Sequence, residues 1–442
     1  MGVSSESFAY LKSIKETSSP EEAKKIIRLM KQYADKNNVQ QAGCIALWTL
    51  GLSEKNKPKL LEYGAGQAII VSMRDYRSDP PVLEACCAAI NNLGGNLYAL
   101  MRMGAGSEVL AVMERYPDSP RLQEHACGAL RTLATSKANS EALIKLGVAE
   151  KLRNCMITHV DVAKVQKAAC GAVWSLCRAE DSRVALWNAG IAPLVLDAMR
   201  KHPDSAKVQE YGCGAIWTIG YIYSMVQLGA SALILNAVRL HIENPRICEY
   251  ACGAIHSLAG LQANSYWLME EKATDVLFAC MSRHINSTVI QEHALLAIWS
   301  LGLWEGNRSR LVDAGVGPLL LGVMGTHKEN SKIVETGCGI ITNLSTVETN
   351  AEAFIVNDAI PKVMAFARQH MQRESVQEKT ICTLRNLSWW SDDHASILVD
   401  QDVNDFIKNL LQNYPRNDVI KTKGKEMLDK LNRIKLRQKG IL

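Results

Sequence analysis

The sequence predicts an all-α protein, a solenoid of about ten three-helix repeats. Three observations predict this fold. A block of similar residues recurs at regular spacing, glycine recurs between two helical patterns in each repeat, and strand patterns are essentially absent. A repeat of roughly 40–47 residues made of two or three helices is typical of α-solenoids. We therefore expect each repeat to bury its faces against its neighbours.

The recurring block lies on a long third helix. Near copies are Gln-Glu-His-Ala-Cys-Gly-Ala-Leu at 123–130, Gln-Glu-Tyr-Gly-Cys-Gly-Ala-Ile at 209–216 and Cys-Glu-Tyr-Ala-Cys-Gly-Ala-Ile at 248–255. The aligned central positions are Cys44, Cys87, Cys127, Cys170, Cys213, Cys252, Leu295, Cys338 and Ile381. They lie 43, 40, 43, 43, 39, 43, 43 and 43 residues apart, and another 43 leads to Gly424 in a degenerate tenth copy. The two short steps predict a trimmed first helix near Asn96 and Tyr223.

Glycine marks the junction between the first and second helices. The junction positions are Gly64, Gly104, Gly147, Gly190, Gly229 and Gly315. A residue that follows a helix C-terminus often adopts the left-handed conformation, which glycine accepts most easily. Each repeat is thus expected to contain a short first helix, a glycine, a second helix, a polar turn and a long third helix.

The segment from Ser182 to Leu194 resembles the armadillo-family motif Asn-x-x-x-Leu-Val-x-x-Gly-Ile-x-Pro-Leu, and the resemblance extends over essentially the whole chain. It implies a right-handed superhelix whose third helices line a concave ligand groove. We expect one armadillo solenoid over residues 1–442. Its N-terminal capping repeat would cover 1–53, eight central repeats 54–391, and a degenerate, basic C-terminal capping repeat 392–442.

Composition excludes several functional classes. The 442 residues carry a formal net charge of +5, and eight Lys or Arg residues lie between Lys421 and Leu442, so the body is near neutral. Such a body gives no electrostatic argument for a nucleic-acid partner. No signal peptide or membrane-spanning stretch is evident, and 13 cysteines without a leader indicate free thiols in a reducing compartment. We expect no membrane insertion and a cytoplasmic location, with the nucleus as a second compartment.

Three stripes run along the side of the third helices opposite the apolar side. They are counted from the Gln of the Val-Gln-Glu block. The acidic stripe, one position on, is Glu84, Glu124, Glu210, Glu249, Glu292, Glu335 and Glu378. The small stripe, five on, is Ala88, Gly128, Gly171, Gly214, Gly253 and Gly339. The large stripe, eight on, is Trp48, Arg131, Trp174, Trp217, His256, Trp299 and Arg385.

The stripes have a functional and a structural interpretation. In the first, carboxylates and tryptophan faces line a groove that binds an extended or helical segment of a protein partner with some basic character. In the second, glycine lets adjacent helices approach, tryptophan is a wedge between repeats, and glutamate is a solvated face. The groove contacts expected from the first are Glu124, Arg131, Trp174, Glu210, Trp217, Glu249, His256, Glu292, Trp299, Asn343 and Asn386.

We therefore expect a non-enzymatic scaffold or adaptor. One alternative is a transport receptor like the nuclear-import adaptors, whose third helices carry a ladder of asparagines. Only Asn92, Asn343 and Asn386 match that ladder, and the basic N-terminal segment of those adaptors is missing. A second alternative is a structural component of a cytoskeletal or ciliary assembly, in which the convex surface would matter more than the groove.

Histidine forms a further column at the end of the second helix. Its members are His159, His202, His241, His284, His327 and His370, with Tyr33, Tyr76 and Tyr116 at the same place earlier. There a histidine can bond the free carbonyls and interact with the helix dipole. Metal binding is disfavoured, because neighbouring repeats are roughly 10 Å apart and metal–nitrogen bonds need about 2 Å.

The remaining signals favour packing over chemistry. The cysteine column lies at the edge of the apolar arc, which favours core packing over a zinc site at Cys248 and Cys252. The helical pattern from Lys421 to Lys439 fits a capping repeat, with a membrane-surface or calmodulin-type helix as the alternative. No phosphate loop, nucleophile elbow or metalloprotease helix occurs, so we expect neither catalytic residues nor a cofactor.

Overall fold

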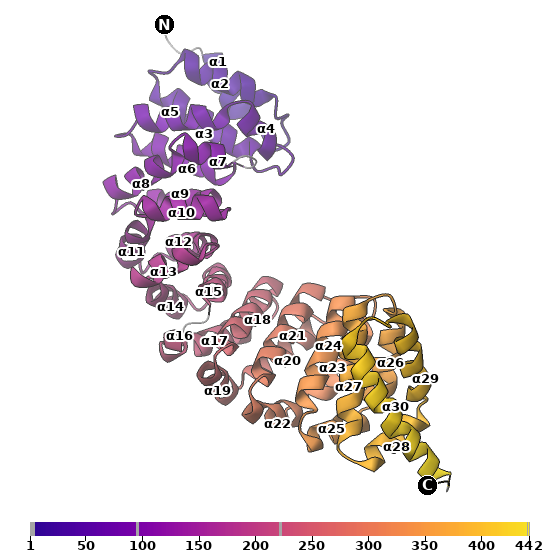
Figure 1. The fold of residues 1–442 in the computed structure, drawn as a ribbon. Coiled ribbons are helices and arrows are strands. Elements are labelled where there is room, and N and C mark those ends of the chain that lie inside the picture. The colour runs from indigo at the N-terminus through magenta and orange to yellow at the C-terminus, as the bar shows by residue number, and fades with distance from the viewer. Residues whose placement is uncertain (1–4, 94–96, 221–222, 440, 442) are drawn as a thin grey trace. The chain divides into compact units, whose positions relative to one another are not determined.

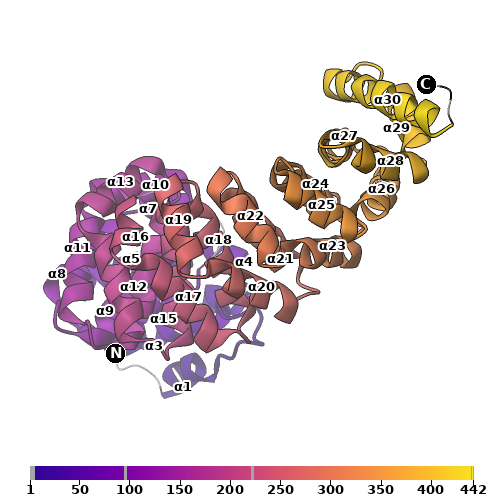
Figure 2. The same cartoon turned by 90° about the horizontal axis from the view of Figure 1, so that it is seen from below.

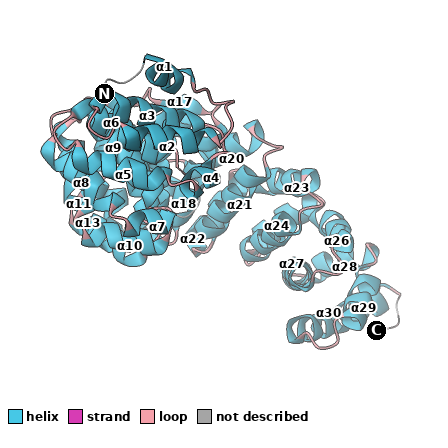
Figure 3. Cartoon of the chain, turned by 90° about the horizontal axis from the view of Figure 1, so that it is seen from above, coloured by secondary structure: helices cyan, strands magenta, loops and turns pink. Residues whose placement is uncertain are grey.

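The computed structural model describes residues 5–93, 97–220, 223–439 and 441. Over these residues it contains thirty α-helices and no strand (Figure 3). The predicted all-α solenoid is confirmed. The helices of the described chain form ten consecutive triplets, one for each repeat that the spacing predicts.

The members of the triplets differ in length. The first helices are α1 (Ser5–Ser13), α4 (Lys57–Glu62), α7 (Leu97–Arg102), α10 (Lys137–Lys145), α13 (Glu180–Asn188), α16 (Tyr223–Gln227), α19 (Gln262–Glu270), α22 (Glu305–Asp313), α25 (Glu348–Val356) and α28 (Asp392–Asp400). The second helices are α2 (Glu22–Gln32), α5 (Ala65–Asp75), α8 (Ala105–Arg115), α11 (Val148–Thr158), α14 (Ile191–Lys201), α17 (Ala230–His241), α20 (Ala273–Arg283), α23 (Val316–Thr326), α26 (Ala359–Gln369) and α29 (Val403–Asn413). The third helices are α3 (Asn37–Leu50), α6 (Pro80–Asn91), α9 (Pro120–Leu133), α12 (Ala163–Leu176), α15 (Ala206–Ile219), α18 (Pro245–Ala259), α21 (Thr288–Gly302), α24 (Ser331–Leu344), α27 (Glu374–Trp389) and α30 (Asp418–Gln438).

The chain divides into two compact units. Unit 1 comprises Met1–Gly220 and Leu228–Leu233, and unit 2 comprises Tyr221–Gln227 and Ile234–Leu442. In unit 1, the third helices α3, α6, α9, α12 and α15 pack on one another in that order (Figure 1). In unit 2, α18, α21, α24, α27 and α30 do the same, and Figure 2 shows α24, α27 and α30 in succession. We call the side of these helices that carries the three stripes the third-helix face of each unit. Their organisation as one domain stays a prediction.

The junction glycines adopt the expected conformation. All six have a positive φ, between 73° and 97°. Three repeats have another residue at this place, and Lys272, Asp358 and Asp402 also take a positive φ, at 61°, 58° and 58°. The short steps of 40 and 39 residues fall at the repeats that contain α7, of six residues, and α16, of five. Helix α4 also has six residues in a repeat of full spacing, so a short first helix is not confined to the two short steps. Asn96 itself lies outside the described residues.

The core follows the apolar side of the third helices. In α12, Val165, Ala169, Ala172 and Val173 are fully buried against neighbouring helices. The cysteine column shares this core: twelve of the thirteen cysteines are buried and unbridged, and Cys382 is half-buried. The prediction that cysteine packs as a small apolar residue is confirmed.

In six of the ten repeats, a buried glutamine ties the third helix to the second. The side-chain amide of Gln166 donates to the carbonyl of Met156 at 2.9 Å and to that of His159 at 2.8 Å. It thereby satisfies two carbonyls at the C-terminus of α11 that have no partner in the helix. The same pair of bonds is made by Gln40, Gln123, Gln209, Gln291 and Gln377.

The histidine column and its tyrosine equivalents tie eight of the repeats to the one before. Nε2 of His202 lies 2.8 Å from the carbonyl oxygen of Val160, and Nε2 of His327 lies 2.7 Å from that of Ile285. Equivalent contacts are made by His159, His284, His370, Tyr76, Tyr116 and Tyr414. The column stands at the predicted helix end but does not cap its own helix there. The buried glutamines donate to the carbonyls at that helix end, and the histidine side chain contacts a carbonyl of the preceding repeat. The expectation that histidine caps its own helix was therefore wrong.

A third column closes the end of the third helices. The side-chain amide of Asn139 donates to the carbonyl of Leu133 at 2.8 Å, from the first turn of the following first helix. The same contact is made by Asn56, Asn307 and Asn350. Two of the three polar columns therefore bond carbonyls at helix ends, and the histidine column bonds carbonyls of the turn in the preceding repeat.

Replacing Gln166 with alanine tests the internal cap. We expect the free energy of unfolding to fall by about 1–3 kcal/mol, because two carbonyls lose their hydrogen-bond donor. Urea unfolding of the full chain measures the change. The control Gln67→Ala removes an exposed glutamine from α5 and should change stability by less than about 0.5 kcal/mol. Equal effects of the two substitutions would contradict the capping role.

Candidate functional site

The large stripe of one repeat lies on the small stripe of the next. A Cβ atom at Gly171 would lie 3.0 Å from Cδ of Arg131, and one at Gly214 would lie 3.3 Å from the ring of Trp174. In unit 2, the ring of Trp299 occupies the corresponding space over Gly339. A methyl group at Gly339 would overlap the ring, whereas at Gly171 and Gly214 the neighbouring side chain would have to move by a few tenths of an ångström. The small stripe thus has a structural role, although it makes room for side chains of the preceding repeat and not for a closer approach of the helices.

The tryptophans of the large stripe still reach the surface. Trp174, Trp217 and Trp299 are all half-buried. The ring of Trp174 lies 6.1 Å from the ring of Tyr211, at an angle of 39°. Nζ of Lys379 lies 5.5 Å from the ring centre of Trp299. Trp174 and Trp299 are wedges between repeats of the same unit that keep part of the ring on the third-helix face.

Several carboxylates of the acidic stripe are paired inside the chain. Glu124 accepts from Lys167 of the next repeat at 3.1 Å. Glu210 is 5% exposed and pairs with Lys207 of its own helix at 2.7 Å. A basic partner segment was expected to bind free carboxylates of the acidic stripe. Because Glu124 and Glu210 are already paired with lysines, the unit 1 face does not support a basic partner.

At Glu292, burial and hydrogen bonding have opposite effects on the pKa of the carboxyl group. It accepts from the Lys332 ammonium, and from the amide of Asn330 at 3.2 Å. Burial by itself would raise the pKa of Glu292, but these two hydrogen bonds outweigh it, so the pKa lies below its ordinary value. The carboxylate is thus ionised and already neutralised by a cation of the next repeat.

Other carboxylates of unit 2 have neutral partners. Glu335 accepts from the hydroxyl of Ser375 at 2.7 Å, and Glu378 accepts from the amide of Asn417. A neutral donor leaves the negative charge in place. Glu249 is half-buried on α18 of the same unit. The unit 2 face therefore keeps part of the predicted acidic character.

The remaining predicted contacts join one repeat to another. The amide nitrogens of Asn343 and Asn386 each lie 2.8 Å from a carbonyl of the preceding repeat, that of Gly302 and that of Thr342. His256 places Nδ1 2.7 Å from the hydroxyl of Ser300, and burial lowers its pKa. These side chains have a structural role that their spacing alone did not reveal.

A hollow of about 380 Å³ opens on the third-helix face of unit 1. Side chains near or on α3, α6, α9, α12 and α15 all contribute to it. Trp48 and Leu52 line it and are 37% and 42% exposed. Arg131, Glu124 and Lys167 also line it. The structure thus brings two predicted contacts, Glu124 and Arg131, into one concave site.

Arg131 spans several repeats within this hollow. Its Nη1 donates to the hydroxyl of Tyr211 at 2.8 Å, and its Nη2 donates to the side-chain oxygen of Asn91 at 3.3 Å. Sequence reasoning missed Tyr211, Asn91, Lys167 and Lys207 as lining residues. Arg131 and Tyr211 are 80 residues apart, so a comparison of adjacent repeats could not pair them.

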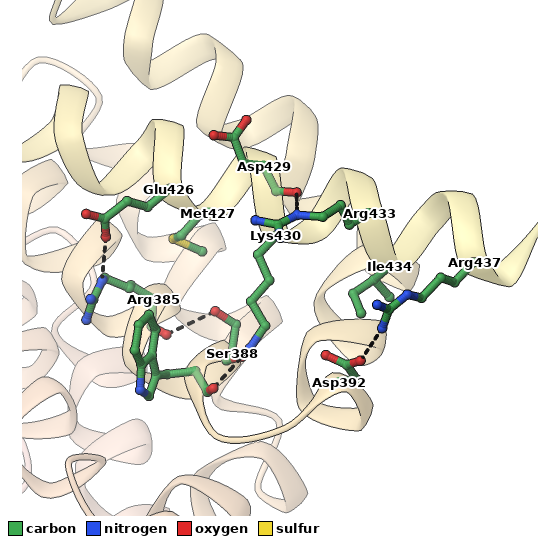
Figure 4. Close-up of a pocket in the computed structure, with 11 residues that line it drawn as sticks. Arg385, Ser388, Asp392, Glu426, Met427, Asp429, Lys430, Arg433, Ile434 and Arg437 are labelled. Atoms are coloured by element: carbon green, nitrogen blue, oxygen red, sulfur yellow. Dashed lines mark hydrogen bonds and ion pairs between the residues drawn. The ribbon is translucent and has the colours of Figure 1, made fainter. Parts of the chain in front are cut away.

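A second hollow, of about 530 Å³, lies between α27, α28 and α30 (Figure 4). Arg385 pairs with Glu426 at 3.1 Å, and Arg437 pairs with Asp392 at 2.7 Å. Lys430 donates to two carbonyls at the end of α27, at 2.6 and 3.0 Å. The basic side chains drawn in Figure 4 are therefore largely engaged by the neighbouring helices.

Packing also decides the role of the basic helix α30. Ile420, Met427, Leu431 and Ile434 form its apolar side and are buried. They pack where α27, α28 and α29 contact α30. The apolar side is thus unavailable to a membrane surface or a partner helix, and the capping interpretation of this segment is supported over the alternative.

Comparisons with known proteins agree with this architecture. The family model described as LRRK2 ARM repeat matches residues 20–185. An engineered protein from a structural genomics consortium has a TM-score of 0.78 at 15% identity, covering 94% of this chain and 99% of its own. The fold of the described chain is thus that of an armadillo-type solenoid, and residues 20–185 match an armadillo-repeat family model.

A further similar structure comes from work on a conserved phosphorylation switch that controls the interaction between cadherin and beta-catenin. It has a TM-score of 0.59 at 15% identity and covers 94% of this chain and 96% of its own. At this identity the likeness concerns the fold. A search of the curated proteins finds no match.

Among the described residues, no three His, Cys, Asp or Glu side chains gather as metal ligands would. Burial raises the pKa of the Cys87 and Cys170 thiols to about 12, which disfavours the reactive thiolate. None of the described helices combines the length and the apolar character that crossing a bilayer requires.

Two glycine-to-alanine substitutions in unit 2 test the contact between the large and small stripes. Gly339→Ala should lower the free energy of unfolding by about 1–3 kcal/mol, because the new methyl group would overlap the ring of Trp299. Gly322→Ala, at an exposed helical position with open space around it, should raise the free energy of unfolding by up to about 1 kcal/mol. Thermal and urea unfolding measure both. Stabilisation by both substitutions would show that glycine is not needed under Trp299.

Proposed function

We propose that this armadillo-type solenoid is a non-enzymatic scaffold or adaptor that holds an extended or helical segment of a partner protein on its third-helix face. The hollow of about 380 Å³ in unit 1 carries this proposal. It is concave, and it combines the exposed apolar side chains Trp48 and Leu52 with charged ones. Such a mixture is typical of sites that bind by an apolar anchor and a few directed polar contacts.

The dimensions fit an extended peptide. Five neighbouring helices at roughly 8–10 Å spacing cover about 40 Å. An extended chain advances about 3.3 Å per residue, so about 12 residues would cross the face of unit 1. A protein interaction is also the subject of the similar structure from work on cadherin and beta-catenin. That likeness supports a protein as the class of partner.

The charge of the partner segment should differ between the two units. Glu335 and Glu378 keep their negative charge beside neutral donors, which supports basic partner residues on the face of unit 2. In unit 1, Glu124 and Glu210 are neutralised by lysines. The basic character predicted for the partner is therefore proposed for unit 2 alone.

The alternatives have weaker support. A transport receptor of the import-adaptor type would need free asparagine amides, whereas those of Asn92, Asn343 and Asn386 donate to the preceding repeat. A role in a cytoskeletal or ciliary assembly would use the outer helices, where Val184 and Val356 are 55% and 76% exposed. The buried free thiols suit a reducing compartment, so we propose a cytoplasmic or nuclear location.

Selection of displayed random peptides of about 12 residues on the immobilised full chain tests the proposal. We expect selected peptides to lose about tenfold or more in affinity for a variant with Trp48→Ala and Leu52→Ala, because its apolar anchor is removed. Fluorescence anisotropy of labelled peptides measures the affinity.

The control carries Ile157→Ala and Val184→Ala, which remove two exposed apolar side chains from α11 and α13 of the same unit. Affinity for this control should stay unchanged. Peptides that depend on Ile157 and Val184 but not on Trp48 and Leu52 would move the binding surface to the outer helices and refute the proposal.

A further inference from the structure

We propose that Arg131 is the docking point for an aspartate or glutamate side chain of the partner segment, in the hollow of unit 1. The inference rests on the proposed function, because it names the chemistry of the segment that the third-helix face would hold. The position of the guanidinium, its charge balance and the apolar wall beside it carry the inference.

The guanidinium is held in place by neighbouring repeats. The side chain begins on α9, passes over Gly171 of α12 and reaches the hydroxyl of Tyr211 on α15, with the two oxygen atoms of Tyr211 and Asn91 as its acceptors. The guanidinium carbon also lies 5.6 Å from the ring centre of Tyr211. A guanidinium has five N–H donors, and these two bonds leave others for a ligand. Because the group is fixed before binding, little side-chain entropy is lost on contact.

No carboxylate of the described residues lies within ion-pair distance of Arg131, whose contacts are the neutral Tyr211 and Asn91. Arg385, the other arginine of the large stripe, differs because it pairs with Glu426 at 3.1 Å. Arg131 is half-buried, and a half-buried cation without an anion favours one from a ligand.

The rest of the hollow is close to neutral, so Arg131 supplies its uncompensated positive charge. Besides Arg131, its lining includes the cations of Lys167 and Lys207 and one carboxylate, Glu124. Lys167 neutralises Glu124, and Lys207 pairs with Glu210. An anionic side chain is therefore attracted to the hollow and a cationic one is repelled. Electrostatic complementarity of this kind selects the partner more than it adds affinity.

The apolar wall of the hollow, formed by Trp48 and Leu52, favours a peptide as the ligand. Trp48 and Leu52 line the hollow together with Arg131, and each is more than one-third exposed. A bound segment can place an apolar side chain on this wall while its carboxylate meets the guanidinium in a two-pronged contact. We therefore expect an acidic residue and a nearby apolar residue in the same segment.

The test uses the peptides selected on the full-length wild-type chain. We expect an aspartate or glutamate at one fixed position among those that depend on Trp48 and Leu52. The substitution Arg131→Gln keeps an amide donor but removes the charge. It should weaken their binding by about 10- to 100-fold, the usual range for a hydrogen bond to a charged group.

A matched control and a second readout make the test independent of folding. Arg153→Gln removes an exposed arginine from α11 and should leave binding unchanged. Circular dichroism and urea unfolding check that Arg131→Gln keeps its structure. Replacing the peptide's acidic residue with its amide, measured on the wild-type chain, should cause a similar loss without any change in the protein.

The outcomes separate the two proposals. Face-dependent peptides without an enriched acidic residue would overturn the inference and leave the scaffold function standing. The same holds if acidic peptides bind Arg131→Gln as tightly as the wild type. Failure to select any peptide that depends on Trp48 and Leu52 would contradict the proposed function itself.

Discussion

The structure depends on side chains that reach from one repeat into the next. Arg131 and Trp174 each lie on a glycine one repeat further along, while His202 and His327 contact a carbonyl one repeat back. A three-helix repeat cannot bury both of its faces alone, so these contacts between neighbours fix the register of the stack. Buried glutamines and asparagines then satisfy the helix ends, because an unpaired buried carbonyl would cost roughly 1–3 kcal/mol.

The contacts between repeats determine which polar side chains are left to bind a partner. Glu124 and Glu210 are neutralised by lysines, and the amides of Asn343 and Asn386 hold the preceding repeat. Arg131 is different, because its neighbours orient the guanidinium without neutralising it. Recognition on the unit 1 face would therefore depend on a residue whose charge the repeat stack leaves uncompensated, beside an exposed apolar wall.

Much of the fold could be predicted from the sequence, because each repeat copies one local pattern. The spacing of the aligned cysteines located the third helices, and the glycine junctions located the left-handed residues. The candidate site was harder. Glu124 and Arg131 were predicted as groove contacts, but the pairing of Glu124 with Lys167 and the contact of Arg131 with Tyr211 cross one and two repeats. Such contacts depend on the spacing and rotation between neighbouring repeats, which periodicity along the chain does not encode.

A double-mutant cycle between Arg131 and the acidic residue of a selected peptide tests the central claim most directly. The four affinities combine wild type or Arg131→Gln with the acidic peptide or its amide counterpart. A direct contact predicts that the two changes are not additive, with a coupling free energy of about 1 kcal/mol or more. Additive losses would show that the carboxylate binds elsewhere on the chain and would contradict the role assigned to Arg131.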